Sequence, residues 1–502
     1  MDGAEGSGGV EVGTDTDFPR GASIRRQEAR PGRLHHRTGA GPVRSLALSA
    51  SEGFRLTPRL RSGLVGDLLV NHITARPTRV RYLVVAALCI AAGIAYIQRN
   101  SYGGADTTIT KELGLTEGQR GNAASLFFLS YALLQVPSGW LAQRLGPRRT
   151  LACIAAGWSI ALAICAAAVS PTTLIDGRLL MGVMQAGIFP CSTLILASWL
   201  PDTQRGTAAA LLNSSMLIGG ALSSNLTGLL IAPLGWRGLF LAFAAPGLIW
   251  AFLFAVWFRN RPADHPGVNS AELDVIEASR SAAEKIAAVS PPAAWTALLF
   301  SGALYCICLQ QFFRSGANRF FDNWFATYLQ EGRGLDRSFA NQLASLPQWA
   351  GVVGGLVGGV LSDYLLIRTG SRRIARQALA IASLVVCLIL YGAAYVIPNA
   401  TLATFTASAG FFIFCFSAPC AYAVTMDMGG RNLGVIFGAM NMLGNFGAVF
   451  FVWLAPLLTG RYGGDWTPTL ILFAAMHVVA LVFWLPLNPN GVIGERIPES
   501  KE

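Results

Sequence analysis

Long runs of apolar residues alternate with short polar segments over most of the chain, starting near Arg81. Each run is apolar on all sides and close to the roughly 20 residues that a helix needs to cross a bilayer. The pattern therefore predicts an all-α membrane protein with twelve transmembrane helices. The twelve predicted spans are approximately 82–104, 122–144, 151–170, 174–199, 208–233, 237–258, 295–330, 342–366, 376–397, 400–426, 434–458 and 466–487.

Composition agrees with this pattern. Hydrophobic residues make up 53% of the 502 residues and charged residues only 13%, whereas soluble domains carry roughly a quarter charged residues. The net charge of +11 comes largely from basic residues that flank the apolar runs. We interpret it as a topology signal and not as a nucleic-acid-binding surface. The nine cysteines lie within the apolar runs and are expected to be small apolar residues without disulfides or bound metal.

The distribution of lysine and arginine between alternate loops predicts the orientation. The loops after even-numbered spans hold Arg144, Arg148, Arg149, Arg205, Arg259, Arg261, Arg280, Lys285, Arg368, Arg372, Arg373, Arg376 and Arg431. The opposite loops hold only Lys111, Arg120, Arg237, Arg333, Arg337 and Arg461. By the positive-inside rule both termini face the cytoplasm. We expect a cytosolic tail over residues 1–77, a six-helix bundle over 78–258, a cytoplasmic linker over 259–294, a second bundle over 295–488 and a short tail over 489–502.

A repeated segment relates the two bundles. Gly139-Trp-Leu-Ala-Gln-Arg-Leu-Gly-Pro-Arg-Arg149 ends the second span, and Gly359-Val-Leu-Ser-Asp, followed by Gly370-Ser-Arg-Arg373, ends the eighth. The same place in each half predicts two pseudo-symmetric six-helix bundles, the architecture of transporters that rock about a central site. Gating is assigned to the repeat residues Gly139, Gln143, Arg144, Gly146, Arg148, Arg149, Gly359, Asp363, Arg372 and Arg373.

At these residues the chain resembles the major facilitator superfamily. Further motifs narrow the resemblance to its anion:cation symporter family, which includes hexuronate and hexonate permeases, sialin and the vesicular glutamate transporters. These motifs are Arg178-x-x-x-Gly182, Ala186-Gly-Ile-Phe-Pro190, Trp199-Leu-Pro201, Arg205-Gly206, Gly235-Trp-Arg237 and Pro262 with His265-Pro266. The resemblance covers about residues 80–490 and implies a transporter for a small anion, without fixing which one.

Three arginines lie at hydrocarbon depth in the predicted spans. The apolar run 83–97 gives about 22 Å of helix, too short for a core of about 30 Å, so the first span must continue past Arg99. Arg178 and Arg314 lie inside the fourth and seventh spans. An intramembrane arginine costs roughly 2.5–3.5 kcal/mol on insertion scales, which favours an anionic partner. The resemblance implies a carboxylate-binding role for Arg99 and Arg178, and Arg314 aligns with an arginine of the vesicular glutamate branch.

Polar residues near these arginines are candidates for binding the rest of the substrate. Tyr96 lies three residues before Arg99 and shares its helix face. The resemblance places Tyr131, Gln310, Gln311, Asn441 and Asn445 along the same cavity. Hydroxyl and amide groups suit a sugar acid, although hydrogen bonding between membrane helices would explain them too. Arg319 has a ready helical partner in Asp322.

Glutamines stand where proton-coupled relatives commonly have carboxylates. Gln98 precedes Arg99, and Gln185 follows Arg178 by seven residues, on the same helix face. Gln143 and Gln204 replace two further loop carboxylates. Because an amide cannot release a proton, we expect altered or absent proton coupling. Uniport, anion exchange, preference for a more highly charged anion, and coupling moved to Asp322, Asp427 or Asp176 all remain open.

The sequence thus favours alternating-access transport of an organic carboxylate, such as a hexonate or hexuronate, by a monomer in the cell membrane. An inorganic phosphate carrier and a non-transporting receptor on the same scaffold are the alternatives. No cofactor, metal site or enzymatic activity is expected, since no metal-ligand cluster, nucleophile motif or phosphate-binding loop is found.

Overall fold

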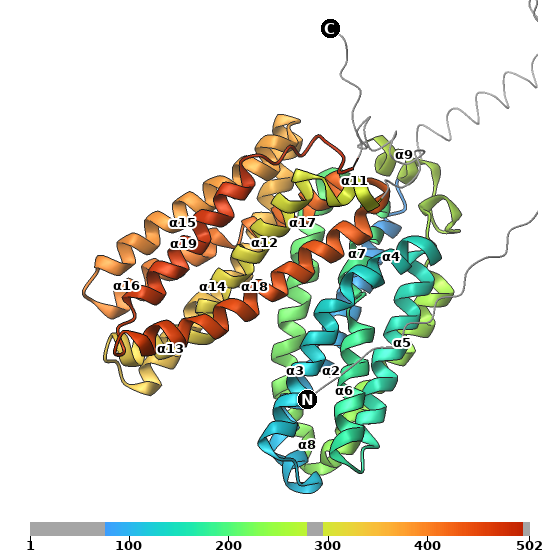
Figure 1. The fold of residues 1–502 in the computed structure, drawn as a ribbon. Helices are drawn as coiled ribbons and strands as arrows, with labels where there is room; N and C mark the ends of the chain where they lie inside the picture. Colours follow the sequence, from blue (N-terminus) through green and yellow to red (C-terminus); the bar gives the residue numbers. More distant parts are fainter. Residues whose placement is uncertain (1–75, 279–294, 495–502) are drawn as a thin grey trace, which may run out of the picture. The chain divides into compact units, whose positions relative to one another are not determined.

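The computed structural model describes residues 76–278 and 295–494, and helices are the regular secondary structure of both ranges. All but residues 76 and 77 of the predicted tail over 1–77 lie outside these ranges, as do residues 495–502 of the predicted tail over 489–502 and residues 279–294 of the predicted linker. The predicted domain boundaries therefore stay predictions. Figure 1 follows the described helices from blue to red along the sequence.

The first half contains a series of long helices. They are α2 (Val80–Leu113), α3 (Glu117–Leu133), α4 (Gln135–Leu145), α5 (Pro147–Ala166), α6 (Pro171–Gln185), α7 (Ile188–Trp199) and α8 (Arg205–Trp257), with the 3-10 turn η1 (Asp202–Gln204) before α8. The turn η2 (Pro262–Asp264) and helix α9 (Ser270–Ala278) follow. α2 packs along α8, and α5 packs against α6 and α8.

The second half repeats this plan. It contains α11 (Trp295–Leu299), α12 (Gly302–Arg319), η3 (Phe320–Trp324), α13 (Phe325–Thr327), η4 (Tyr328–Gly332), α14 (Arg337–Thr369), η5 (Arg373–Ala378), α15 (Leu379–Val396), α16 (Ala400–Phe414), α17 (Ser417–Met428), η6 (Gly430–Asn432), α18 (Leu433–Arg461) and α19 (Thr467–Trp484). α12 packs on α18 and α19, and α15 packs on α16.

Within the described residues, nine helical stretches are long and apolar enough to cross a membrane, and the bent pair α3–α4 makes a tenth. One of the nine, residues 202–257, covers two predicted spans. These two spans are separated by a break inside α8 at Gly235, whose φ is 65°. That left-handed conformation is one that glycine adopts readily. The predicted seventh span follows α12 to η4 but is too polar for the same criterion. Each of the twelve predicted spans is largely helical in the structure. That all twelve cross the membrane stays a prediction.

Several predicted spans are broken for identifiable reasons. α3 and α4 meet at an angle of 47°, where Pro137 lacks an N–H and its ring would clash with the carbonyl of Leu133 in a straight helix. The predicted span 295–330 was wrong as one continuous helix. α11 ends at Leu299, α12 starts at Gly302, and the π-helical segments η3 and η4 interrupt the far part. Such π-helical segments are frequent at functional sites.

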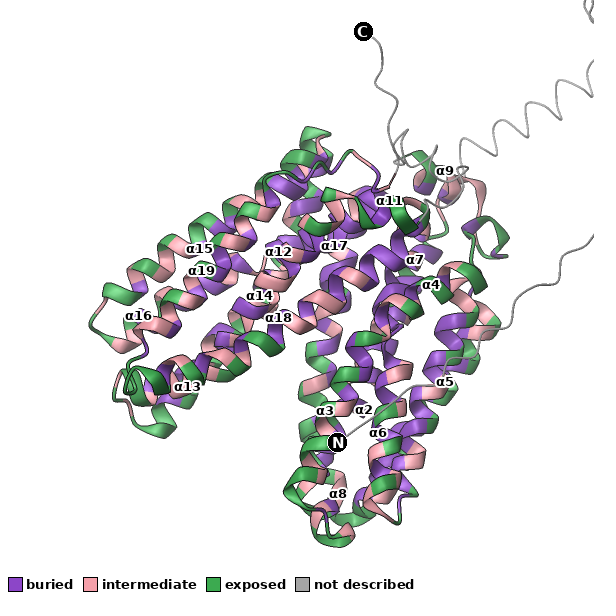
Figure 2. Cartoon of the chain, in the orientation of Figure 1, coloured by how far each residue is buried: buried purple, intermediate pink, exposed green. Residues whose placement is uncertain are grey.

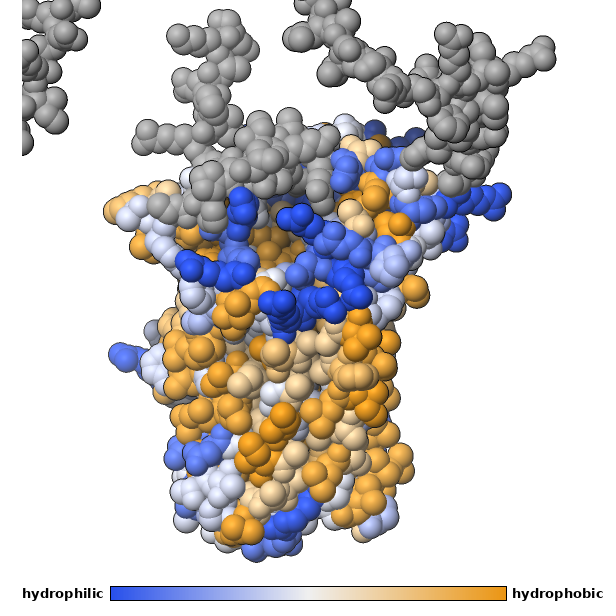
Figure 3. All heavy atoms as spheres, turned by 90° about the vertical axis from the view of Figure 1, so that its right-hand side faces the viewer, coloured by the Kyte–Doolittle hydropathy of each residue, from blue (hydrophilic) through white to orange (hydrophobic). Residues whose placement is uncertain are grey.

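Exposed side chains are largely apolar, as lipid contact requires. Large hydrophobic residues such as Ile90, Phe252 and Ile389 are exposed, and on the face drawn in Figure 3 hydrophobic residues cover the middle while hydrophilic ones gather toward the ends. By contrast, eleven of the twelve residues of α17 and nine of the twelve of α7 are buried. Figure 2 shows both helices in the region where buried residues concentrate. The halves contact each other mainly through α4 with α18 and α8 with α14, and α7 and α17 extend this contact.

The first part of the predicted linker, residues 259–278, is held to the start of α2 by specific contacts of Glu272. Glu272 on α9 is fully buried and accepts hydrogen bonds from the hydroxyl of Thr78, the backbone N–H groups of Val80 and Arg81, and the Arg81 guanidinium at 3.2 Å. Burial alone would raise the pKa of Glu272, but these bonds outweigh burial and lower it. This contact could not be predicted from the sequence, because Glu272 lies in a polar stretch.

We expect Glu272→Gln to destabilise the protein at pH 7 by about 2 kcal/mol, the size of a hydrogen bond to a charged group. Because the folded-state pKa is lowered, this stabilisation is complete above the usual carboxyl pKa and disappears as the pH falls through the lowered value. Thermal melting in detergent from pH 7 down to pH 3 measures the difference. Glu277→Gln, exposed on the same helix, serves as the control. An equal effect of both substitutions would contradict the assignment.

Candidate anion-binding site

A cavity of about 300 Å³ lies between the two halves. Its lining comes from α2, α3, α7 and α8 of the first half and from α12, η3, α14, α16, α17 and α18 of the second. Residues predicted as substrate-binding that line it are Tyr96, Arg99, Tyr131, Arg314, Asn441 and Asn445, together with Gln311, Arg319 and Asp322. The structure therefore brings most of the predicted binding residues together from five separate elements, α2, α3, α12, η3 and α18.

Arg99 is a buried cation held largely by neutral groups. Its side chain lies over three aromatic rings, with Cζ at 4.4 Å from the centre of Tyr131, 4.5 Å from Tyr96 and 5.0 Å from Phe127. Its Nε donates to Oε1 of Gln185 at 3.0 Å, whereas its Nη2 is buried without a hydrogen-bond partner among the described residues. Arg99 thus has a hydrogen-bond donor that no described residue satisfies.

Arg314 is the corresponding group in the second half. Its Nε donates to Oε1 of Gln311, one helical turn earlier, at 3.1 Å. Only 8% of Arg314 and 8% of Arg99 is exposed. Neither arginine forms a salt bridge with a carboxylate of the described residues. Two guanidinium groups therefore contribute positive charge to one cavity from opposite halves, and a planar fork of N–H donors suits a carboxylate or sulfonate.

Asp322, the acidic residue that lines the cavity, already has partners in the protein. Asp322 forms the predicted ion pair with Arg319 at 2.9 Å. It also accepts hydrogen bonds from the amides of Asn318 at 2.9 Å and Gln348 at 3.2 Å. The pair Arg319–Asp322 is neutral as a whole, so the charge of Arg99 and Arg314 is left without a counter-ion.

Aromatic and amide groups form the wall next to the contact between halves. The amide of Asn441 donates to Oε1 of Gln135 across the halves at 2.7 Å, and Asn445 donates to the carbonyl of Asn441 at 2.8 Å. Phe189 and Tyr422 face each other from α7 and α17, with ring centres 6.2 Å apart. Sequence reasoning missed these two rings. Phe189 lies in a recognised motif, but Tyr422 sits in an apolar run with no distinguishing signal.

Two predicted binding residues lie outside the cavity lining. Arg178 is sandwiched between the rings of Tyr102 and Phe127, at 4.5 Å from each centre. It donates to the carbonyls of Ala123 at 3.3 Å and Arg99 at 3.5 Å. Arg178 therefore supports Arg99 from behind. Gln310 turns back to the carbonyl of Ile307 at 2.9 Å, because its helix position faces the bundle interior and not the cavity.

The two glutamines at the coupling positions differ in their surroundings. Gln98 donates to the carbonyl of Phe243 at 2.7 Å and to Ser159 at 3.3 Å, which joins α2 to α5 and α8. Gln185 instead contacts Arg99 and donates its amide to the carbonyl of Ala95 at 3.0 Å. Of the two positions, only 185 places its side chain directly on the arginine of the cavity.

Contacts between the halves gather at the end where the repeated segments lie, which we call the basic end. Asp363 of the second repeat accepts the backbone N–H groups of Gly206 at 3.0 Å and Thr207 at 2.7 Å, and so caps the N-terminus of α8. Gln143 of the first repeat accepts the N–H of Val435 at 3.2 Å near the start of α18 and donates to the carbonyl of Arg431. Each repeat thus caps a helix of the other half, as helix termini favour.

A buried charge cluster reinforces the basic end. Asp427 pairs with Arg205 at 2.6 Å and Arg376 at 3.5 Å, Arg376 also pairs with Asp363 at 2.9 Å, and Arg372 pairs with Asp202 at 2.8 Å. The candidate proton site Asp427 is therefore part of this cluster and not of the cavity.

The other gating residues support the same end in simpler ways. A Cβ atom at Gly139 would overlap the carbonyl of Gly434, and one at Gly359 would overlap that of Gly206, so glycine permits close helix approach. Gly146 turns the chain with a φ of 85°. Arg148 donates to the carbonyl of Ala255 at 2.8 Å, and Arg144 stacks on Trp140. Arg149 and Arg373 are exposed.

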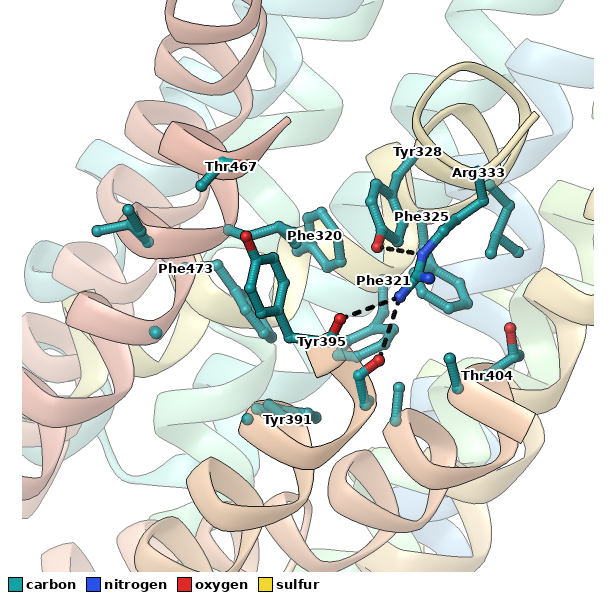
Figure 4. A pocket seen from close by; sticks show the side chains of 18 of the residues that line it. Phe320, Phe321, Phe325, Tyr328, Arg333, Tyr391, Tyr395, Thr404, Thr467 and Phe473 are labelled. Atoms are coloured by element: carbon teal, nitrogen blue, oxygen red, sulfur yellow. Dashed lines mark hydrogen bonds between the residues drawn. The ribbon is translucent and has the colours of Figure 1, made fainter. Parts of the chain in front are cut away.

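A second cavity, of about 330 Å³, lies inside the second half and is lined mainly by aromatic and aliphatic side chains (Figure 4). Arg333 reaches its edge but donates to the hydroxyl of Tyr328 at 2.9 Å and to the carbonyls of Ile397 at 3.0 Å and Ala394 at 3.2 Å. Its charge is thus held by backbone dipoles. This cavity is much poorer in polar groups than the central one. Among the described residues no group of three or more metal-ligating side chains gathers.

Comparison with known proteins identifies the family. The family model of the Major Facilitator Superfamily matches residues 88–443 and, in a second match, residues 307–499. The chain belongs to the Major Facilitator Superfamily. The expected family and two-bundle fold are therefore confirmed, and the family and the similar proteins are transporters and not enzymes.

Similar sequences come from transporters of organic anions. A probable sulfoacetate transporter of Cupriavidus necator is 30% identical over 82% of this chain and 94% of that protein. A D-galactonate transporter of Escherichia coli is 28% identical over 84% and 98%. A probable galactarate/D-glucarate transporter of Escherichia coli is 28% identical over 82% and 94%.

Solved structures agree on the fold. The proton:xylose symporter XylE has a TM-score of 0.62 at 14% identity and covers 83% of this chain and 98% of its own. The transporter FucP, in the outward conformation, has a TM-score of 0.59 at 15% identity and covers 81% and 99%.

The separate positions of Arg99 and Arg178 predict different mutant phenotypes. We expect Arg178→Gln to lower the melting temperature while an anionic ligand still raises it, because Arg178 supports Arg99 from outside the cavity. Arg99→Gln should instead remove the ligand-induced shift. Thermal-shift measurements of both variants with and without D-glucarate, sulfoacetate and D-galactonate compare them. Equal loss of the shift in both would place Arg178 in direct contact with the ligand.

Proposed function

We propose that the protein carries a small organic anion across a membrane, bound between its two halves by Arg99 and Arg314. The observation that supports this most is the pair of buried guanidinium groups lining one cavity without a carboxylate partner among the described residues. Holding such charges inside a membrane protein is costly unless a negative partner is present at some stage. A visiting anion supplies that partner.

The remaining lining suits an organic rather than a purely inorganic anion. Tyr96, Tyr131 and Tyr422 offer hydroxyls, and Asn441 and Asn445 offer amides, a mixture that matches the hydroxyl groups of a sugar acid. The volume of about 300 Å³ is at the lower end for small-molecule sites. The similar proteins act on sulfoacetate, galactonate, galactarate and glucarate according to their names, and we assign this chain to the same class of small organic acids.

Alternating access follows from the family fold, and the contacts at the basic end describe one of its states. By the positive-inside rule we place the basic end at the cytoplasm, and we therefore assign the structure to a state of the carrier that is closed to the cytoplasm. Opening that side requires breaking the capping bonds of Asp363 and Gln143 and the pair Arg205–Asp427. We further propose that both termini are cytoplasmic, that the halves span 78–258 and 295–488, and that a monomer in the cell membrane is sufficient.

Proton coupling by the usual carboxylates is not available to this chain. Gln98 and Gln185 occupy those positions. Of the alternative carboxylates, Asp322 is paired with Arg319, and Asp427 with Arg205 and Arg376. Asp176 is exposed and does not line the cavity. We therefore propose transport without stoichiometric proton uptake.

A ligand screen on purified protein tests the function. We expect at least one of D-glucarate, sulfoacetate and D-galactonate to raise the melting temperature, with inorganic phosphate as the competing candidate. Arg99→Gln and Arg314→Gln should each weaken binding by about 10- to 100-fold, since a hydrogen bond to a charged group is worth about 1.5–3 kcal/mol.

Arg368→Gln, at the basic end and outside the cavity, is the matched control and should bind as the native chain does. Binding of the anion unchanged in both cavity variants would refute the proposed site. A response to phosphate alone would favour a phosphate carrier.

A further inference from the structure

The cavity lining carries a positive charge that no carboxylate of the described residues neutralises. Arg99 and Arg314 contribute two positive charges, and each has an amide oxygen, of Gln185 or Gln311, as its recorded side-chain acceptor. The remaining charged pair of the cavity, Arg319 with Asp322, is neutral as a unit. Asp427 and Asp363 are engaged in the cluster at the basic end.

This imbalance matters most at the moment of conformational change. Passing from one open side to the other requires an occluded stage, in which the cavity is closed to bulk water. Like charges repel more strongly as water is excluded, and each loses solvation. A bound anion removes both penalties, whereas no carboxylate of residues 76–278 and 295–494 forms a salt bridge with Arg99 or Arg314 that could do so.

We propose that this carrier crosses between its two open states only when an anion is bound, so that it works as an obligatory anion exchanger and not as a uniporter. The inference rests on the proposed function, since it assumes that Arg99 and Arg314 hold the transported anion. In this proposal, the side chain at position 185 decides between obligatory exchange and uniport. The arginine-facing residue at 185 is an amide, so it orients Arg99 without neutralising it.

Gln185 therefore offers a sharp test. Its Oε1 lies 3.0 Å from Nε of Arg99, so Gln185→Glu would place a counter-ion on Arg99 with almost no rearrangement. The empty variant should then close, and net uptake without exchange should become possible. Gln185→Met removes the hydrogen bond without adding charge and is the matched control.

The first experiment needs no substrate. Spin labels at Asn122 near the start of α3 and Asn341 near the start of α14, both exposed, report the separation of the halves at the end opposite the basic end. The nine cysteines are replaced by alanine for this measurement. We expect the ligand-free chain and Gln185→Met to show a long-distance population, and Gln185→Glu to add a shorter one. A short population of equal size in all three would overturn the inference.

The second experiment measures transport by the chain with its native cysteines in proteoliposomes under a clamped membrane potential. Labelled D-glucarate or sulfoacetate is supplied outside, and the lumen holds either the same unlabelled anion or none. We expect uptake into loaded vesicles to be at least tenfold faster, and Gln185→Glu to narrow this ratio to about twofold. Equal uptake into loaded and empty vesicles by the native chain would overturn the exchange mode while upholding transport. Failure of both anions to enter under either condition would count against the proposed substrate class, and the label distances would still decide the charge argument.

Discussion

The structure is organised around two guanidinium groups that share one cavity inside a largely apolar molecule. Arg99 and Arg314 come from opposite halves, so their charge acts at the surface along which the halves must move. Arg99 is held by aromatic faces and an amide, which stabilise a cation without cancelling it. These neutral contacts stabilise the buried arginine in the folded protein and leave its positive charge free to bind an anion. The same feature links binding, charge balance and conformational change.

The two repeated segments make equivalent contacts between the halves, but with different side chains. Asp363 and Gln143 occupy matching places in the repeated segments, and each caps a helix of the opposite half. One contact uses a carboxylate next to Arg376, and the other uses a neutral amide. Since a charge-assisted bond at a helix N-terminus is the stronger kind, the contact through Asp363 and Asp427 is expected to hold the basic end more firmly.

The comparisons separate fold from chemistry. XylE and FucP share the arrangement of helices at 14% and 15% identity, while the more similar sequences are transporters of organic acids. A common scaffold can serve different solutes because the cavity is lined by a few side chains from many helices. In this chain those side chains include two arginines that form no salt bridge with a described residue, and glutamines stand at both expected coupling positions.

The sequence by itself determined the helical membrane class, the repeated halves, the family resemblance and the set of candidate arginines. The membrane class and the candidate arginines follow from apolar run length and from the high cost of a buried charge. The repeated halves and the family resemblance follow from short motifs, and all of these are properties of local sequence. Only the tertiary structure decided which candidates meet. It placed Arg314, Tyr131 and Asn441 around one cavity with Arg99, set Arg178 behind Arg99, and turned Gln310 inward. It also revealed the burial of Glu272 and the role of Tyr422. The rotation of each packed helix sets these directions: successive residues point about 100° apart, so Gln311 faces the cavity while Gln310 faces the bundle interior.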